Sequence, residues 1–543
     1  MSHADIPPET IRSDREEPAE RPTLVIDGCA IATMDGGPDA SRPTTGTEYD
    51  RGFIAVSGDR ITAVGPGPAP HGRPARYIDG TGCLATPGLV NTHHHLYQWA
   101  TRGLAQDAIL FDWLRTLYPI WSHIDEEIVG AAAGAGLASL ALSGCTLSAD
   151  HHYLFPMGAG DLLGATVSAA RTVGLRFHPT RGSMDLGESA GGLPPDSVVE
   201  DRDTALAATA EAIDRFHDPA PGAMVRVGVS PCSPFSATGG LMREAAELAR
   251  ARTVRMHTHL AETVEEEAYC IELFGRTPGQ YMSDLGWLGP DVWMAHCVWL
   301  GDDAVGRFGA TGTGVAHCPS SNARLGAGIA PVRHMLDAEV PVGLGVDGAA
   351  SNEAGELVVE LRQALLAARV RSVGPLRAPT AAGAARAGGG DTARTAETDA
   401  GRGPRDPTPV NPRRQEPRGT TPWNPRGAGP GALSVRETLA MATIGGARCL
   451  GWDGELGSLE PGKLADIALW RLDTLGHTGI ADPIAALVLG PRPPLALLLV
   501  GGRTVVEDGE LRTADTAGLA RDARAAARRL LANESPAAAR MPS

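Results

Sequence analysis

The sequence predicts an α/β fold: a (β/α)8 TIM barrel with a small β-sandwich domain built from both chain ends. Eight strand-like runs separated by helix-like segments lie between Pro87 and about Arg371, which is the number of units in such a barrel. Short strands with turns occur on either side of this region, as in TLVIDGCAIAT and LALLLVGGRTVVEDG. Ionisable residues stand where the central strands end, which is where a barrel builds its active site.

The central strands and helices follow one another in a regular order. A helix pattern runs from Asp125 to Ser143, Gly144 ends it, and the strand TLSAD follows. The pattern recurs as DTALAATAEAIDRF before AMVRVGVS, GLMREAAELARA before TVRMHTH, and PVRHMLDAE before VPVGLGVD. The eight strand candidates are LVNTH, TLSAD, GLRFHP, MVRVGVS, VRMHTH, VWMAH, GVAH and VGLGVD.

Changes in composition divide the chain into seven segments. Residues 372–431 are rich in Pro, Gly and Arg, and from 373 onward their only apolar side chains besides alanine are Val373, Leu376, Val410 and Trp423. This composition predicts a disordered insertion on the face opposite the active site, and its deletion is expected to leave turnover nearly intact. The predicted segments are a disordered tail (1–21), the N-terminal half of the β-sandwich (22–86), the barrel (87–371), the insertion (372–431), a barrel-closing helix (432–450), the C-terminal half of the β-sandwich (451–515) and a C-terminal helix and tail (516–543).

Charge and cysteine usage narrow the class of partner. The net charge of −16 and the pI near 5.5 argue against a nucleic-acid partner, and no apolar run reaches membrane-spanning length. Eight cysteines without a CxxC pair indicate reduced thiols and a cytoplasmic protein. We therefore expect a small-molecule substrate.

Lys463 is the only lysine in the chain, and it is expected to face solvent in a C-terminal turn. A phosphate-binding loop lysine, a Schiff-base lysine and a carboxylated bridging lysine all require a lysine in the catalytic core. The barrel has none, so these chemistries are excluded.

The strand-end residues are typical of a hydrolytic metal centre. His93 and His95 share one side of their strand because strand side chains alternate, and a third imidazole from another strand would complete a site for zinc or iron(II). Asp347 ends an apolar strand, where an unpaired carboxylate would be costly, and metal ligation explains it. Glu262 follows the strand-end His259; taken alone it is either a proton shuttle or a first-turn residue that complements a helix dipole.

Four motifs together resemble the amidohydrolase superfamily in its mononuclear deaminase branch. They are PGLVNTHHH, HTHLAE, MAHC and GVDGAASN, and the resemblance covers roughly residues 22–371 and 432–511. It implies one divalent metal ion, Zn²⁺ or Fe²⁺, per subunit, and it favours a homo-oligomer. The implied metal ligands are His93, His95, His259 and Asp347, and the implied catalytic residues are Glu262, His296 and Asp347.

Within this branch, strings such as GCTLSADHHYLFP and RGSMDLGESAGGLPPD most resemble the 8-oxoguanine deaminases. Hydroxytriazine hydrolases share much of the same set of motifs. Guanine deaminases share Gln98, but their substrate-binding arginine on strand four is replaced here by the run 230–233. The resemblance implies deamination of 8-oxoguanine to urate and ammonia, or of a related aminopurine or aminopyrimidine. The implied substrate-binding residues are Gln98, Arg181, Asp185 and Asn322.

Several alternatives stay open at this point. An s-triazine amino- or chlorohydrolase of the hydroxyatrazine type would use the same metal chemistry, and a guanine deaminase or a non-enzymatic binding scaffold is less favoured. His151, His152 and His317 end other strands and either line the pocket or support it. The aromatic residues Trp99, Trp113, Tyr118 and Trp121 form either a pocket wall or a packed loop.

Overall fold

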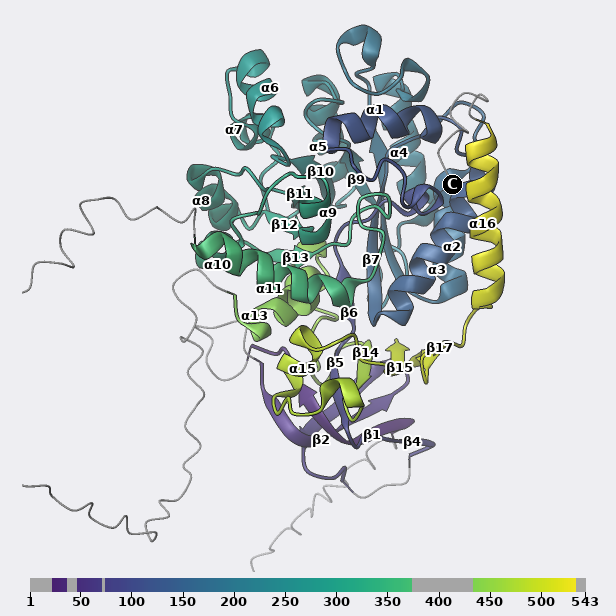
Figure 1. The fold of residues 1–543 in the computed structure, drawn as a ribbon, viewed down its shortest axis with the longest axis vertical. Helices are drawn as coiled ribbons and strands as arrows, with labels where there is room; N and C mark the ends of the chain where they lie inside the picture. Colours follow the sequence, from purple (N-terminus) through teal and green to yellow (C-terminus); the bar gives the residue numbers. More distant parts are fainter. Residues whose placement is uncertain (1–21, 37–45, 71–73, 374–432, 534–543) are drawn as a thin grey trace, which may run out of the picture.

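The computed structural model describes residues 22–36, 46–70, 74–373 and 433–533. Eight parallel strands close into a barrel, and a nine-stranded sheet built from both chain ends lies below it (Figure 1). The predicted fold class is therefore confirmed. The barrel strands are β6 (Leu89–Asn91), β7 (Cys145–His152), β8 (Arg176–Ser183), β9 (Gly228–Pro231), β10 (Met256–Leu260), β11 (Val292–His296), β12 (Gly314–His317) and β13 (Val342–Leu344).

Helices surround the barrel and connect its strands. Asp125 caps α2 by accepting a hydrogen bond from the Ile128 amide at 3.0 Å, and Gly144, at φ +86°, turns the chain into β7 after the helix ends. The predicted start and end of this helix are confirmed. The connecting helices are η1 (Leu96–Thr101), α1 (Leu110–Trp121), α2 (Glu126–Leu142), α3 (Leu162–Val173), η2 (Glu188–Ala190), η3 (Asp196–Val198), α4 (Arg202–Phe216), α5 (Gly239–Ala251), α6 (Val264–Phe274), α7 (Pro278–Asp284), α8 (Asp302–Thr311), α9 (Pro319–Arg324), α10 (Val332–Asp337) and α11 (Leu357–Val373).

The two chain ends meet in one sheet. β5 pairs antiparallel with β14 in the register Ile467↔Pro87 to Arg471↔Cys83, and this pairing joins the N-terminal strands to the C-terminal ones. The sheet strands are β1 (Leu24–Ala32), β2 (Glu48–Ser57), β3 (Arg60–Pro66), β4 (Arg76–Asp79), β5 (Cys83–Pro87), β14 (Ile467–Arg471), β15 (Leu495–Val500), β16 (Arg503–Glu507) and β17 (Glu510–Leu511).

The C-terminal helices close the barrel and cover one side of it. A continuous helical run lies under the barrel, where a Cβ on Gly446 would come within 3.0 Å of Val90. The long helix α16 (Thr516–Ala532) packs along α2 (Figure 1). The run consists of α13 (Val435–Ala440), the π-helical turn η4 (Met441–Gly445) and α14 (Gly446–Leu450); η5 (Leu475–His477) and α15 (Pro483–Leu489) follow it.

Some expectations fall outside the described residues, and two details differ from the prediction. The expected tail 1–21, most of the insertion and the last ten residues lie outside them, and the domain boundaries stay predictions.

Helix α11 extends through Val373, so residues 372 and 373 belong to the barrel helix. Lys463 does not face open solvent: its side chain is 15% exposed and donates to the Asp453 carbonyl at 2.8 Å, which ties the turn together.

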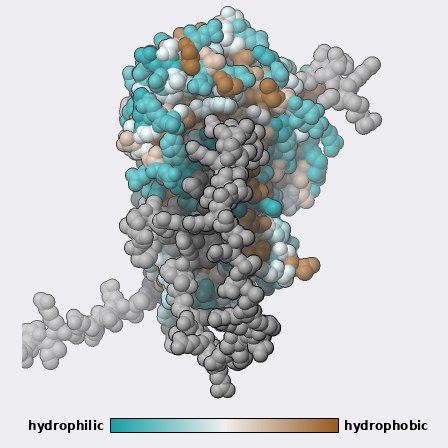
Figure 2. Space-filling view, turned by 60° about the vertical axis from the view of Figure 1, so that its left-hand side comes forward, coloured by the Kyte–Doolittle hydropathy of each residue, from teal (hydrophilic) through white to brown (hydrophobic). Residues whose placement is uncertain are grey.

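The surface agrees with the charged composition. The described portion of the face in Figure 2 is largely hydrophilic, with hydrophobic residues in small scattered groups. Among the described residues, no helix combines the length and the apolar character that a membrane span needs.

Candidate active site

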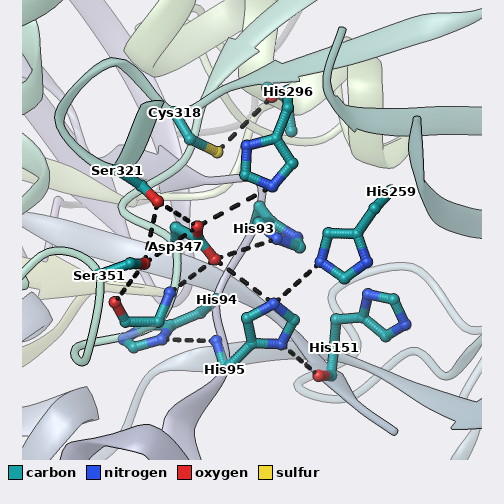
Figure 3. Close-up of polar contacts among 12 residues, drawn as sticks. His93, His94, His95, His151, His259, His296, Cys318, Ser321, Asp347 and Ser351 are labelled. Carbon is teal, nitrogen blue, oxygen red and sulfur yellow. Dashed lines mark hydrogen bonds and ion pairs between the residues drawn. The ribbon is translucent and has the colours of Figure 1, made fainter. Parts of the chain in front are cut away.

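The predicted residues converge at the C-terminal ends of the barrel strands (Figure 3). The Oδ1 atom of Asp347 lies 3.3 Å from His93 Nε2 and 3.4 Å from His95 Nε2, and its Oδ2 lies 3.9 Å from His296 Nε2. His95 Nε2 and His259 Nε2 are 3.0 Å apart. Residues at the ends of four different barrel strands, β6, β10, β11 and β13, thus form one buried cluster.

The three imidazoles that were predicted as ligands present unprotonated nitrogens to the cluster. Burial lowers the pKa of His93, His95 and His259, so that these rings are neutral. His95 Nδ1 donates to the His151 carbonyl at 2.6 Å and His259 Nδ1 to the Cys232 carbonyl at 2.7 Å. Since a neutral imidazole carries one proton, both Nε2 atoms hold lone pairs that face each other.

Such an arrangement fits a cation. Two facing lone pairs repel, and the buried His93 Nε2 has no hydrogen-bond partner, so a positive ion among these atoms would satisfy all of them. Nitrogen and carboxylate oxygen atoms are donors that zinc and iron(II) accept. The structure therefore contains a buried His/Asp group able to hold a metal ion.

His151 is a fourth imidazole beside this group that was not predicted as a ligand. Its ring stacks on that of His259 with centroids 4.8 Å apart, and its Nε2 donates to the Ser230 carbonyl at 3.0 Å. Its Nδ1 is buried without a partner. A ligand atom of His151 lies within 4.8 Å of those of the three predicted histidines, so His151 either supports the site or joins it.

The backbone is strained where these strands end. Ala261, His296, Cys297 and Asp347 have φ angles of +50°, +69°, +48° and +64°, in the left-handed region that side chains other than glycine rarely adopt. Strain of this kind persists only where surrounding contacts hold it, and it concentrates at functional sites. Here Ser321 Oγ donates to Asp347 Oδ2 at 2.6 Å and the Gly348 amide donates to Oδ1 at 2.7 Å, which holds the carboxylate in place.

Glu262 and His296 form an acid–base pair next to the metal group. His296 Nε2 lies 3.7 Å from Glu262 Oε2. Burial raises the pKa of Glu262 to about 7, so the protonated and ionised forms are both populated near neutral pH. Burial alone would lower the pKa of His296, but the negative charges of Glu262 and Asp347 outweigh it and raise that pKa.

Glu266 fixes the loop that carries Glu262, and the sequence patterns did not reveal it. Its two carboxyl oxygens accept the Ala261 amide at 2.8 Å and the Glu262 amide at 3.0 Å. The spacing of four residues after Glu262 is the only local signal.

A narrow cavity of about 30 Å³ adjoins the metal group. Gln98 lies in its wall, and the buried Oε1 of this residue lacks a partner. None of the described residues that line the cavity is Arg or Lys. The lining residues are His95, Gln98, Leu110, Trp113, Leu114, Tyr118, Tyr153, Cys232, Phe235, His259, Glu262, His296, Leu325 and Asp347.

The other predicted substrate-binding residues are engaged elsewhere and do not line this cavity. Arg181 forms an ion pair with Glu200 at 2.6 Å, and Asp185 accepts the Thr238 amide at 2.7 Å and its hydroxyl at 2.6 Å. Asn322 accepts a hydrogen bond from His296 Nδ1 at 2.9 Å and so orients that imidazole. Of the four predicted substrate-binding residues, only Gln98 lines this cavity. Of the aromatic cluster, Trp113 and Tyr118 line the cavity, whereas Trp121 packs behind them.

A barrel with a strand-end His/Asp group and an adjacent carboxyl acid defines a class: metal-dependent hydrolases of the (β/α)8 type. The amidohydrolase family model matches residues 84–385 and 425–505, and the chain belongs to that family. Together with the relatives described next, this membership makes it a hydrolase of the deaminase type that acts on C–N bonds.

Three relatives illustrate the range of the similarity. The chain is 38% identical to an 8-oxoguanine deaminase of Pseudomonas aeruginosa over 90% of its own length and 96% of the relative's. It is 37% identical to an isoxanthopterin deaminase from an unknown prokaryotic organism, over 94% and 97% of the two chains. The crystal structure of an atrazine chlorohydrolase from Arthrobacter aurescens TC1 complexed with zinc aligns with a TM-score of 0.76 at 31% identity, covering 93% of this chain and all of that one.

Proposed function

We propose that the protein is a metal-dependent aminohydrolase that deaminates 8-oxoguanine, or a closely related aminopurine or aminopyrimidine. The observation that carries this proposal is the convergence at one cavity of a buried His/Asp group, the Glu262 carboxyl with its pKa of about 7, and Gln98, whose Oε1 has no hydrogen-bond partner. The similarity to an 8-oxoguanine deaminase over nearly the whole chain supports it.

One divalent ion, Zn²⁺ or Fe²⁺, would be held by His93, His95, His259 and Asp347. When bound, this ion would act as a Lewis acid and make water a nucleophile at neutral pH. The zinc in the related chlorohydrolase structure supports zinc.

The chain's own residues would then move the protons. Asp347 Oδ2 would take a proton from the attacking water and pass it to the leaving amine. Glu262, whose pKa is about 7, would donate from Oε2 to the ring nitrogen beside the attacked carbon and regain a proton from the new hydroxyl group as the carbonyl forms. His296 Nε2 lies between the two carboxylates and would stabilise the charge that develops on oxygen. Water is consumed, the C–N bond breaks and ammonia leaves; with 8-oxoguanine the attacked carbon is C2 and the other product is urate.

The cavity supports a neutral planar substrate. Its aromatic wall offers stacking surfaces, and none of the described residues that line it is an arginine or lysine that would select an anion. Gln98 Oε1 would accept a hydrogen bond from a ring N–H or amino group. Because about 30 Å³ accommodates roughly one water molecule, the wall must move to admit a heterocycle.

An s-triazine hydrolase is the second candidate. The leucines in the cavity wall favour it, since Leu110, Leu114 and Leu325 could pack against alkyl substituents. The cytoplasmic location, the homo-oligomer and the substrate roles of Arg181, Asp185 and Asn322 stay predictions.

A substrate panel tests the proposal. Protein loaded with Zn²⁺ would be incubated with 8-oxoguanine, guanine, isocytosine, isoxanthopterin and hydroxyatrazine, and ammonia release would be measured alongside urate absorbance. The highest kcat/KM is expected for 8-oxoguanine. Preferential turnover of hydroxyatrazine would favour the second candidate, and absence of turnover on all five would contradict the proposal.

A further inference from the structure

His257 lies directly behind the predicted ligand His93, at the base of the metal group. It occupies β10 two residues before His259, so both side chains point into the barrel. His257 Nε2 lies 2.8 Å from His93 Nδ1, and His257 Nδ1 lies 2.9 Å from the Trp293 carbonyl oxygen. The side chain is 1% exposed and stacks on the Trp293 indole with centroids 4.5 Å apart.

The direction of these hydrogen bonds follows from chemistry. The Trp293 carbonyl can only accept, so His257 Nδ1 carries the proton of the neutral ring and His257 Nε2 is a bare acceptor. His93 Nδ1 must therefore carry the proton that lies between the two rings. The consequence is that His93 Nε2 is bare, and it is this buried atom that lacks a hydrogen-bond partner and faces Asp347 Oδ1 at 3.3 Å.

His93 differs in this respect from the other two imidazole ligands. The Nδ1 atoms of His95 and His259 donate to main-chain carbonyls, which no side-chain substitution removes. For His93 the acceptor is another side chain. The tautomer of this ligand thus depends on one replaceable residue.

We propose that His257 is a positioning residue that holds His93 in its metal-binding tautomer and orientation. The inference rests on the proposed metal site, because it requires His93 to be a ligand. Hydrogen-bond acceptors behind ligating histidines commonly contribute about 10- to 100-fold to metal affinity.

The test compares His257→Gln with His257→Met. Both side chains are unbranched and similar in length, but only the amide of Gln can accept the His93 Nδ1 proton. Zn²⁺ affinity would be measured by competition with a chromophoric chelator, and the thermal stability of the metal-free proteins would be compared. We expect His257→Met to weaken Zn²⁺ binding about 10- to 100-fold and His257→Gln to retain most of the affinity, with similar metal-free Tm values.

A third variant and a control separate packing from hydrogen bonding. His257→Phe keeps the stacking on Trp293 without an acceptor and should behave like His257→Met. His178 is another buried imidazole against Trp293, with centroids 5.4 Å apart, and it accepts from Trp452 Nε1 at 3.1 Å. His178→Phe should leave Zn²⁺ affinity unchanged.

Equal Zn²⁺ affinities in the Gln, Met and Phe variants, whether all retained or all weakened, would overturn the role of His257. Failure of the wild-type protein to bind Zn²⁺, or retention of binding in His93→Ala, would instead overturn the proposed metal site and this inference with it.

Discussion

Charged groups are buried at both ends of the barrel, but they are satisfied in opposite ways. At the lower end, Arg176, the first residue of β8, pairs with Asp466 through two contacts of 3.0 and 3.1 Å and donates to the Gly222 and Ala223 carbonyls; both side chains are 2% exposed. At the upper end, His93, His95 and His259 turn bare nitrogens toward one another and toward Asp347. The lower cluster is satisfied within the protein, whereas the bare nitrogens of the upper one would be satisfied by a cation.

This difference separates a group of residues that holds the structure from one that binds a ligand. Leaving buried polar atoms unpaired costs free energy, and a fold tolerates it where binding supplies the missing partner. Substitutions at the lower end should therefore change stability, and those at the upper end should change metal binding or turnover.

The largest effect is expected from Glu262→Gln. The amide cannot donate an acidic proton to the ring nitrogen, so kcat should fall about 10²- to 10⁴-fold, while the Zn²⁺ content stays at the wild-type level because Glu262 is not a predicted ligand. Steady-state kinetics and metal analysis would check this. Glu265→Gln, on the exposed side of α6, serves as the matched control. A kcat near that of the wild type would refute the proton-donor role.

The upper cluster was predictable from sequence to the extent that its residues sit at strand ends. The spacing of His93 and His95 predicted two side chains on one face of a strand; both lie beyond the end of β6 at Asn91 and still reach the same site. The order of the eight strands brought His259, His296 and Asp347 beside them. The supporting contacts were not predictable, because they depend on register between strands. Glu200 and Thr238, which engage Arg181 and Asp185, lie 19 and 53 residues away from them, and no local pattern connects these positions.

Substitutions in the lower cluster should change the free energy of unfolding of the protein. Arg176→Met leaves Asp466 buried without its charge partner, and the free energy of unfolding should fall by about 3–5 kcal/mol. Urea unfolding measures this loss. The double variant Arg176→Met/Asp466→Leu should regain much of it, since no charge then remains buried, and Zn²⁺ affinity should stay unchanged in both. A single variant as stable as the wild type would contradict the comparison.

Glu266 sharpens the comparison, because it is a buried carboxyl at the upper end with amide partners but no cationic partner. Burial raises its pKa to about 7, against an ordinary value of 4.5. A raised folded-state pKa stabilises the protein below the unfolded-state pKa, and this contribution disappears as the pH rises from about 4.5 to about 7, on the order of 3 kcal/mol in all. Glu266→Gln does not titrate, so its stability relative to the wild type should improve across this range. Urea unfolding at pH 5 and pH 8 would measure the change, and a constant difference would show that Glu266 does not take up this proton.

Removal of residues 374–431 should have the smallest effect of all. A helix that follows a barrel strand runs back toward the lower end, so α11 leads the chain away from the metal group before this segment begins. The flanking helices α11 and α13 pack against each other, and a Gly/Ser linker can replace the segment between them. We expect kcat and Zn²⁺ content to match the wild type. A replacement of equal length with Gly and Ser would distinguish loss of the native sequence from shortening of the connection. If kcat collapsed in both variants, the segment itself would contribute to the upper end, and the division between the two ends would no longer hold.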